Sequence, residues 1–166
     1  MKTPRATSVR GQLVLIALTC MVWPALGSTA RSATVEIDGV IVPGVGVQWT
    51  SKGQPASAVA LNPGDTVVWK AVSGTHGVVF DTESAAEAVL QFQAGGGLPP
   101  LGPQTVKGEL VWGTAPQPPV GAGTLLAQAT VKPGTAPGTK LGFFCSSKAA
   151  PPLTTAVAML VPLSVK

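Results

Sequence analysis

Three side chains beyond residue 30 could bind a transition metal, and each is the only one of its type there: His76, Cys145 and Met159. An imidazole nitrogen, a thiolate and a thioether are donors that redox-active metals take from proteins. The same residues also have ordinary structural roles, as a hydrogen-bonded core histidine, a small buried cysteine and a packing methionine. Because no second cysteine lies beyond residue 30, Cys145 is a reduced thiol, an intermolecular link or a metal ligand.

The first 30 residues predict a secretory signal peptide that is cleaved after Ala30. A basic start is followed by the apolar run 13–26 and then by small residues, which is the organisation of such a signal. The apolar run is shorter than the roughly 20 residues that span a bilayer. An uncleaved membrane anchor is the alternative. We therefore expect a periplasmic or secreted protein of residues 31–166 with no membrane span after cleavage.

The net charge of the mature chain is close to zero. Three of the 11 lysines and arginines lie in the leader, which leaves 8 basic residues against 7 acidic ones. Tyrosine is absent and aromatic residues make up 5% of the chain. A nucleic-acid partner is not expected, because neither a basic surface nor many stacking side chains are available.

The composition and turn pattern predict an all-β protein. Its 20 glycines and 16 prolines disfavour long helices. Seven or eight short segments with strand character are separated by turn signals, a pattern that is typical of an antiparallel Greek-key β-sandwich. The predicted strands are 33–37, 44–50, 58–61, 66–70, 76–81, 125–131, 140–145 and 157–165. The large core candidates are Trp49, Trp69, Phe80, Phe92, Trp112 and Phe143.

The middle of the chain is less regular. Residues 84–93 predict a short helix capped by Ser84, with Glu87 three positions later, and a strand that ends at Phe92 is the alternative. Residues 94–120 are rich in Gly, Pro and Gln. We interpret them as a long irregular insertion with one short strand at 110–112, of the kind that is often functional.

Four segments together resemble cupredoxins, the small blue copper proteins of the plastocyanin and pseudoazurin kind. They are NPGDTVVWK (62–70), THGVVFD (75–81), PGTKLGFFC (137–145) and VAMLVPLSV (157–165). The resemblance covers about half of the mature chain and implies a cupredoxin-type β-sandwich that binds one copper ion. In that family the matching positions make His76 and Cys145 equatorial ligands and Met159 the axial ligand. The resemblance also implies one-electron transfer to a redox partner protein.

One ligand of the family pattern is missing. The family places its second histidine at Cys-x2-His or Cys-x4-His, where this chain has Lys148 and Ala150. A protonated lysine has no lone pair to donate to a metal. Two hypotheses follow: an electron-transfer protein with an incomplete or atypical type 1 copper site, or a copper-free cupredoxin-like binding or structural module that uses segment 94–120 for recognition.

An enzymatic function has little support in the sequence. A Cys–His nucleophile pair would need an oxyanion site in addition to hydrogen-bond contact, and the resemblance makes these residues ligands. The run Gly95–Gly97 is not followed by Lys-Ser or Lys-Thr, so it is no phosphate-binding loop. No carboxylate-rich group suggests glycoside or hard-metal chemistry. We therefore expect a carrier or binding protein and not a catalyst.

Overall fold

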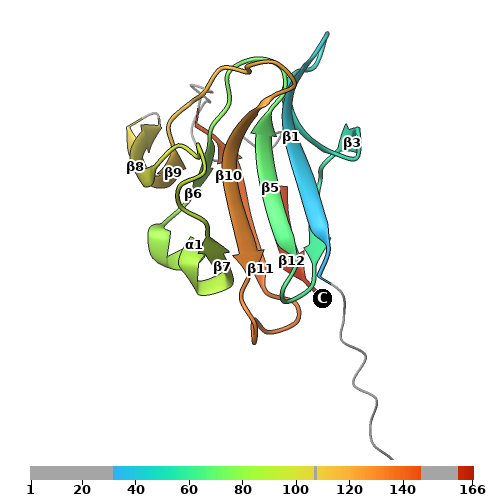
Figure 1. Cartoon of the computed structure of the whole chain (residues 1–166), viewed down its shortest axis with the longest axis vertical. Coiled ribbons are helices and arrows are strands. Elements are labelled where there is room, and N and C mark those ends of the chain that lie inside the picture. Colours follow the sequence, from blue (N-terminus) through green and yellow to red (C-terminus); the bar gives the residue numbers. More distant parts are fainter. Residues whose placement is uncertain (1–31, 107, 147–160) are drawn as a thin grey trace, which may run out of the picture. The chain divides into compact units, whose positions relative to one another are not determined.

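The computed structural model describes residues 32–106, 108–146 and 161–166, which form two six-stranded sheets and one short helix (Figure 1). The first sheet has the order β3-β2-β1-β5-β10-β7. Its strands are β1 (Thr34–Val42), β2 (Gly46–Ser51), β3 (Gln54–Pro55), β5 (Thr66–Ala71), β7 (Leu90–Phe92) and β10 (Thr124–Val131). The second sheet has the order β4-β12-β11-β6-β9-β8. Its strands are β4 (Val59–Leu61), β6 (Val78–Phe80), β8 (Leu101–Val106), β9 (Glu109–Thr114), β11 (Lys140–Cys145) and β12 (Val161–Val165).

The predicted fold class is confirmed as an all-β sandwich, with two six-stranded sheets over one core. Neighbouring strands are mainly antiparallel, and each sheet also contains one parallel pair, β1 with β5 and β4 with β12. These parallel pairs arise because the chain crosses between the sheets instead of turning back within one. In Figure 1, β1, β5 and β10 lie in front of β11 and β12.

The core lies between the two sheets and is built on large aromatic side chains. Trp49, Trp69, Phe80 and Phe143 are fully buried, and Trp112 is nearly so. Phe92 is partly buried and packs against this cluster. The six predicted core aromatics therefore all belong to the core or its margin. Their rings are in mutual contact, at centroid distances from 5.2 to 6.4 Å.

The predicted turn before β5 is held by a buried carboxylate. Asp65 accepts hydrogen bonds from the backbone N–H of Ala33 (2.8 Å) and of Asn62 (2.7 Å). Burial opposes ionisation of this carboxyl, but the two N–H groups and the Asn62 side-chain amide outweigh it and lower its pKa below the usual range. The contact joins the start of β1 to the turn and fixes the parallel register of β1 and β5.

The helix prediction was correct in kind but wrong at its start. Helix α1 (Glu83–Val89) is capped by Thr82, whose Oγ1 accepts a hydrogen bond from Ala85 N at 3.1 Å, and not by Ser84. The strand alternative also applies, because β7 begins directly after the helix and ends at Phe92. Seven residues of helix followed by three of strand therefore occupy the segment.

The insertion is more regular than the sequence indicated. Its middle part forms an antiparallel hairpin of β8 and β9, with Pro103 opposite Trp112. β8 is the edge strand of its sheet. A proline is tolerated there because one side of an edge strand needs no backbone donor. The sequence pattern did not predict this strand, because Gly102 and Pro103 are residues typical of loops.

Several predictions fall outside the described residues: the signal peptide over residues 1–30, the ligand Met159 and the loop residue Lys148. The last predicted strand, 157–165, is described only from Val161. In the part of the chain that the structure describes, no helix has the length and apolar character needed to cross a membrane.

Candidate metal centre

His76 lies between β5 and β6 and is completely buried. Its backbone forms an isolated antiparallel bridge with Gln117: His76 N donates to the Gln117 carbonyl at 3.0 Å and Gln117 N donates to the His76 carbonyl at 2.7 Å. Two residues later β6 begins and pairs with β11. The histidine is therefore held by backbone contacts on both sides.

Cys145 is the last residue of β11, and its position follows from the register of that strand. It lies opposite Val78 in β6. The next residue, Ser146, fixes the strand end, because its N–H donates to the Gly77 carbonyl and its Oγ donates to the Thr114 carbonyl, both at 3.0 Å. This pairing brings together two residues that are 69 positions apart in the sequence.

The two side chains converge. The Sγ atom of Cys145 lies 3.5 Å from Nδ1 of His76. The other ring nitrogen, Nε2, lies 3.0 Å from the Ser73 carbonyl oxygen. A carbonyl can only accept, so in the neutral imidazole Nε2 carries the proton and Nδ1 directs its lone pair at the sulfur.

Apolar side chains and a glycine surround this pair. The Trp49 ring lies 5.4 Å from the His76 ring and 5.5 Å from the Phe143 ring, measured between centroids. On β1, a Cβ atom at Gly39 would lie 2.6 Å from Cγ of His76. The imidazole therefore occupies space that only a glycine leaves open.

We predict that Gly39→Ala displaces the His76 ring. No backbone strain is involved, because the φ angle of Gly39 lies outside the left-handed region. The new methyl group meets the imidazole, and overpacking of this kind costs about 1–3 kcal/mol. Thermal unfolding should show the loss of stability, and NMR of the imidazole should show a changed ring environment.

Gly102→Ala is the matched control for that variant. Gly102 is also a strand glycine, and a Cβ atom there would meet nothing within 4 Å. Its stability should stay within about 0.5 kcal/mol of the natural protein. Equal effects of the two substitutions would contradict the packing argument.

The described residues supply two donors to the candidate centre, Nδ1 of His76 and Sγ of Cys145. No group of three or more His, Cys, Asp or Glu side chains with metal-binding geometry occurs among residues 32–106, 108–146 and 161–166. The axial ligand predicted at Met159 stays a prediction. The same holds for the expectation that the ligand position of the second histidine is not filled by Lys148.

The sequence pattern did not identify the residues that orient His76. Ser73, Gly39 and Trp49 contact His76 from a turn and two strands. The Ser73-Gly74 turn signal three residues before the histidine could have identified the carbonyl contact. The other two contacts depend on the pairing of β1 with β2, which no local pattern specifies.

Two features of the pair decide what chemistry it can perform. Cys145 is 2% exposed and His76 is fully buried, so a substrate has no direct path to the thiol. A nucleophilic cysteine needs access to its substrate in addition to a base. A thiol and an oriented imidazole without such access fit a small buried ligand, such as a metal ion, or a structural hydrogen bond.

The comparisons with known proteins give distant structural similarities. No protein-family model and no curated protein matches the chain. Among solved structures, it is similar to rusticyanin from Thiobacillus ferrooxidans, with 16% identity and a TM-score of 0.42 over 82% of this chain and 79% of rusticyanin. It is also similar to a multi-copper oxidase from Pseudomonas thermotolerans, with 15% identity and a TM-score of 0.31 over 82% of this chain and 29% of the oxidase. Similarity at this distance assigns no function.

Proposed function

We propose that this chain is an exported copper protein that carries one electron at a time. His76 and Cys145 would hold the copper ion, and Met159 would supply the weak axial thioether. The observation that supports the proposal is the convergence of Nδ1 and Sγ to 3.5 Å while Nε2 is engaged by the Ser73 carbonyl.

The distance suits two ligands of one metal. Metal–nitrogen and metal–sulfur bonds of about 2.0 and 2.3 Å, at a tetrahedral or trigonal angle, separate the two donor atoms by about 3.5–3.8 Å. A thiolate is soft and favours Cu(I), whereas imidazole suits both oxidation states. Copper bound to such donors accepts and releases a single electron.

The residues around the pair would hold its geometry constant. The Ser73 carbonyl keeps the proton on Nε2 and the ring in one orientation. The two hydrogen bonds of Ser146 anchor the end of β11. Trp49, which packs against Phe143, covers one side of the imidazole. A site that does not rearrange suits electron transfer, because both oxidation states then use one geometry.

The remaining ligand position would be taken by water, a backbone oxygen or a ligand of a partner, since Lys148 stands where the second histidine is expected. The centre is therefore proposed as an incomplete or atypical type 1 site. A signal peptide over residues 1–30 would place the protein in the periplasm or outside the cell, where a redox partner protein would exchange electrons with it.

Titration of the metal-free protein with Cu(II) tests this function. We expect an intense visible absorption band from charge transfer between the Cys145 thiolate and copper, saturating at one equivalent of copper. Elemental analysis of the purified protein should give the same stoichiometry. A colourless protein that retains no copper would reject the proposal and leave the copper-free module, with recognition by segment 94–120.

A further inference from the structure

A line of alternating tryptophan and phenylalanine rings runs through the core. Beginning beside the candidate metal centre, the Trp49 and Trp69 rings each contact the Phe143 ring, at centroid distances of 5.5 and 5.6 Å. The Trp69 and Trp112 rings each contact the Phe80 ring, at 6.0 and 6.4 Å. Electron transfer slows steeply with distance, so several short steps between rings are faster than one long step. The line therefore divides a path across the core into short steps between tryptophans, each bridged by one phenylalanine.

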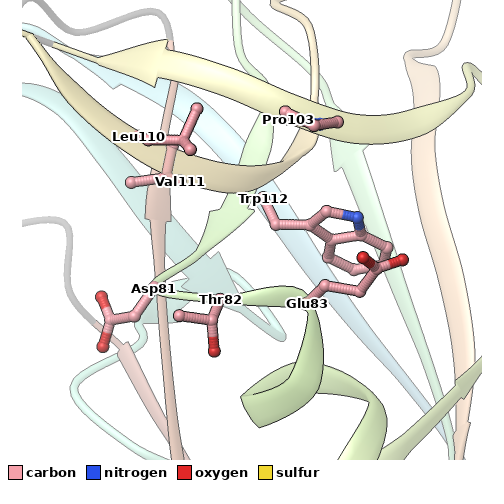
Figure 2. Close-up of a pocket in the computed structure, with 7 residues that line it drawn as sticks. All are labelled: Asp81, Thr82, Glu83, Pro103, Leu110, Val111 and Trp112. Atoms are coloured by element: carbon pink, nitrogen blue, oxygen red, sulfur yellow. The ribbon is translucent and has the colours of Figure 1, made fainter.

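The two ends of the line lie in different surroundings. At the inner end, the Trp49 ring lies 5.4 Å from the His76 ring, whose Nδ1 atom lies 3.5 Å from Sγ of Cys145. At the outer end, Trp112 lines a cavity of about 200 Å3 together with Leu110, which is 75% exposed. Figure 2 shows the Trp112 indole among the residues that line this cavity. The line therefore connects a buried thiol–imidazole pair with a cavity beside the solvent.

Of the three tryptophans in this line, only Trp112 retains contact with solvent. It is 7% exposed, whereas Trp49 and Trp69 are completely buried. Indole and phenol are the aromatic side chains that lose an electron most readily, and the chain contains no tyrosine. An oxidant that meets the described surface would therefore take an electron from Trp112 before it reached either inner ring.

The two inner tryptophans carry a polar group that has no apparent structural role. The Nε1 atoms of Trp49 and Trp69 are buried and have no hydrogen-bond partner among the described residues. Native structures seldom leave a buried donor unpaired, because the lost hydration is not replaced. An oxidised indole normally gives up this proton to an acceptor, which traps the radical. Without an acceptor the proton stays on Nε1, and the radical cation can still take an electron from its neighbour.

We propose that these three tryptophans form a relay that carries an oxidising equivalent from the surface to the Cys145–His76 pair. A strong one-electron oxidant, such as an oxidising radical, removes one electron from the Trp112 indole and is itself reduced. An electron from Trp69 then restores Trp112, and an electron from Trp49 restores Trp69. The Cys145 thiol supplies the electron that restores Trp49, and its proton moves to Nδ1 of His76. The oxidant has then gained one electron, the sulfur has become a thiyl radical, and the imidazole has become a cation.

Such a relay would protect the aromatic core from oxidation. A radical that stays on an indole reacts further and damages the ring, whereas a radical passed inward leaves every ring intact and ends at one sulfur. The inference does not rest on the proposed function, because the thiol is the electron donor in the metal-free protein. With copper bound as proposed above, the metal site would supply the electron and no proton would move.

Flash photolysis of the metal-free protein tests where the relay begins. A flash converts tris(bipyridine)ruthenium(II) into a strong one-electron oxidant when hexaammineruthenium(III) accepts the electron, and transient absorption then records the tryptophan radical. Trp23, which lies outside the described residues, is replaced by phenylalanine in every sample. Trp112→Phe should lower the radical yield by at least an order of magnitude, because the other two indoles are buried. An unchanged yield would overturn the proposal.

Trp69→Phe tests the middle of the relay. It keeps an aromatic ring in the core but removes the intermediate electron donor, so the radical on Trp112 should persist at least an order of magnitude longer. Phe92→Leu is the control, because Phe92 contacts Trp112 and Phe80 but lies beside the line and not between two tryptophans. An unchanged radical lifetime in Trp69→Phe, or an equal increase in the control, would refute the relay.

Cys145→Ala tests the inner end and decides the case if Trp69→Phe does not fold. Circular dichroism checks the fold of each variant. Without the thiol, the tryptophan radical should persist at least an order of magnitude longer than with Cys145 in place. An unchanged lifetime would exclude the thiol as the electron source, and the proposal would fail. A failed copper titration would leave these results unaffected, because every sample is metal-free.

Discussion

The Cys145→Ser variant is expected to lose the visible copper absorption completely. The band arises from charge transfer out of the thiolate, and a serine hydroxyl neither ionises near neutral pH nor donates to copper as a soft ligand. The register of β11 against β6 places this sulfur beside His76. Absorption spectra recorded with one equivalent of Cu(II) would measure the loss.

Cys145→Ala provides the control for burial. Cys145 is almost fully buried, so a serine there also buries a hydroxyl group, which can destabilise the fold. Alanine removes the sulfur without adding a polar atom. Both variants should lose the band, and circular dichroism should show that the alanine variant keeps its β structure. A band that survives in the folded alanine variant would exclude Cys145 as the ligand.

Local sequence signals predicted much of this fold because they act within a few residues. The turn at Asn62–Asp65 and the alternation in the strands around it are local features, and they lead to β5 and β6 in the expected order. The aromatic core was also predictable, because large apolar rings have few alternatives to burial. Such signals identified His76 and Cys145 but not the 3.5 Å between them.

The features that were missed depend on pairing between distant segments. β8 contains Gly102 and Pro103, which look like a loop, and it is a strand only because β9 lies beside it. The helix cap is a local exception: Ser84 was predicted, but the cap is Thr82, two residues earlier, and both residue types are good caps. The contact of Gly39 with His76 crosses from β1 to a loop, so no local pattern reports it.

The Lys148→His variant is expected to strengthen copper binding and intensify the visible band. Position 148 follows Cys145 at the Cys-x2-His spacing of cupredoxins, and a histidine there would supply the missing imidazole. Lysine supplies no lone pair while protonated, and its charge repels the copper cation. A gain of one strong ligand should tighten binding at least about tenfold, equivalent to 1.4 kcal/mol, measured by competition with a chelator of known affinity.

Lys148→Gln separates the new ligand from the removed charge. Glutamine abolishes the positive charge without providing an imidazole, so a gain that appears equally in both variants would come from electrostatics alone. A gain confined to histidine indicates that the loop after Cys145 still directs position 148 at the metal. If Lys148→His acquires a strong band that the natural protein lacks, the copper-free module is the better description of the natural chain. If the histidine variant binds no copper where a control cupredoxin does, the loop does not direct position 148 at the metal, and the copper proposal weakens for the natural chain too.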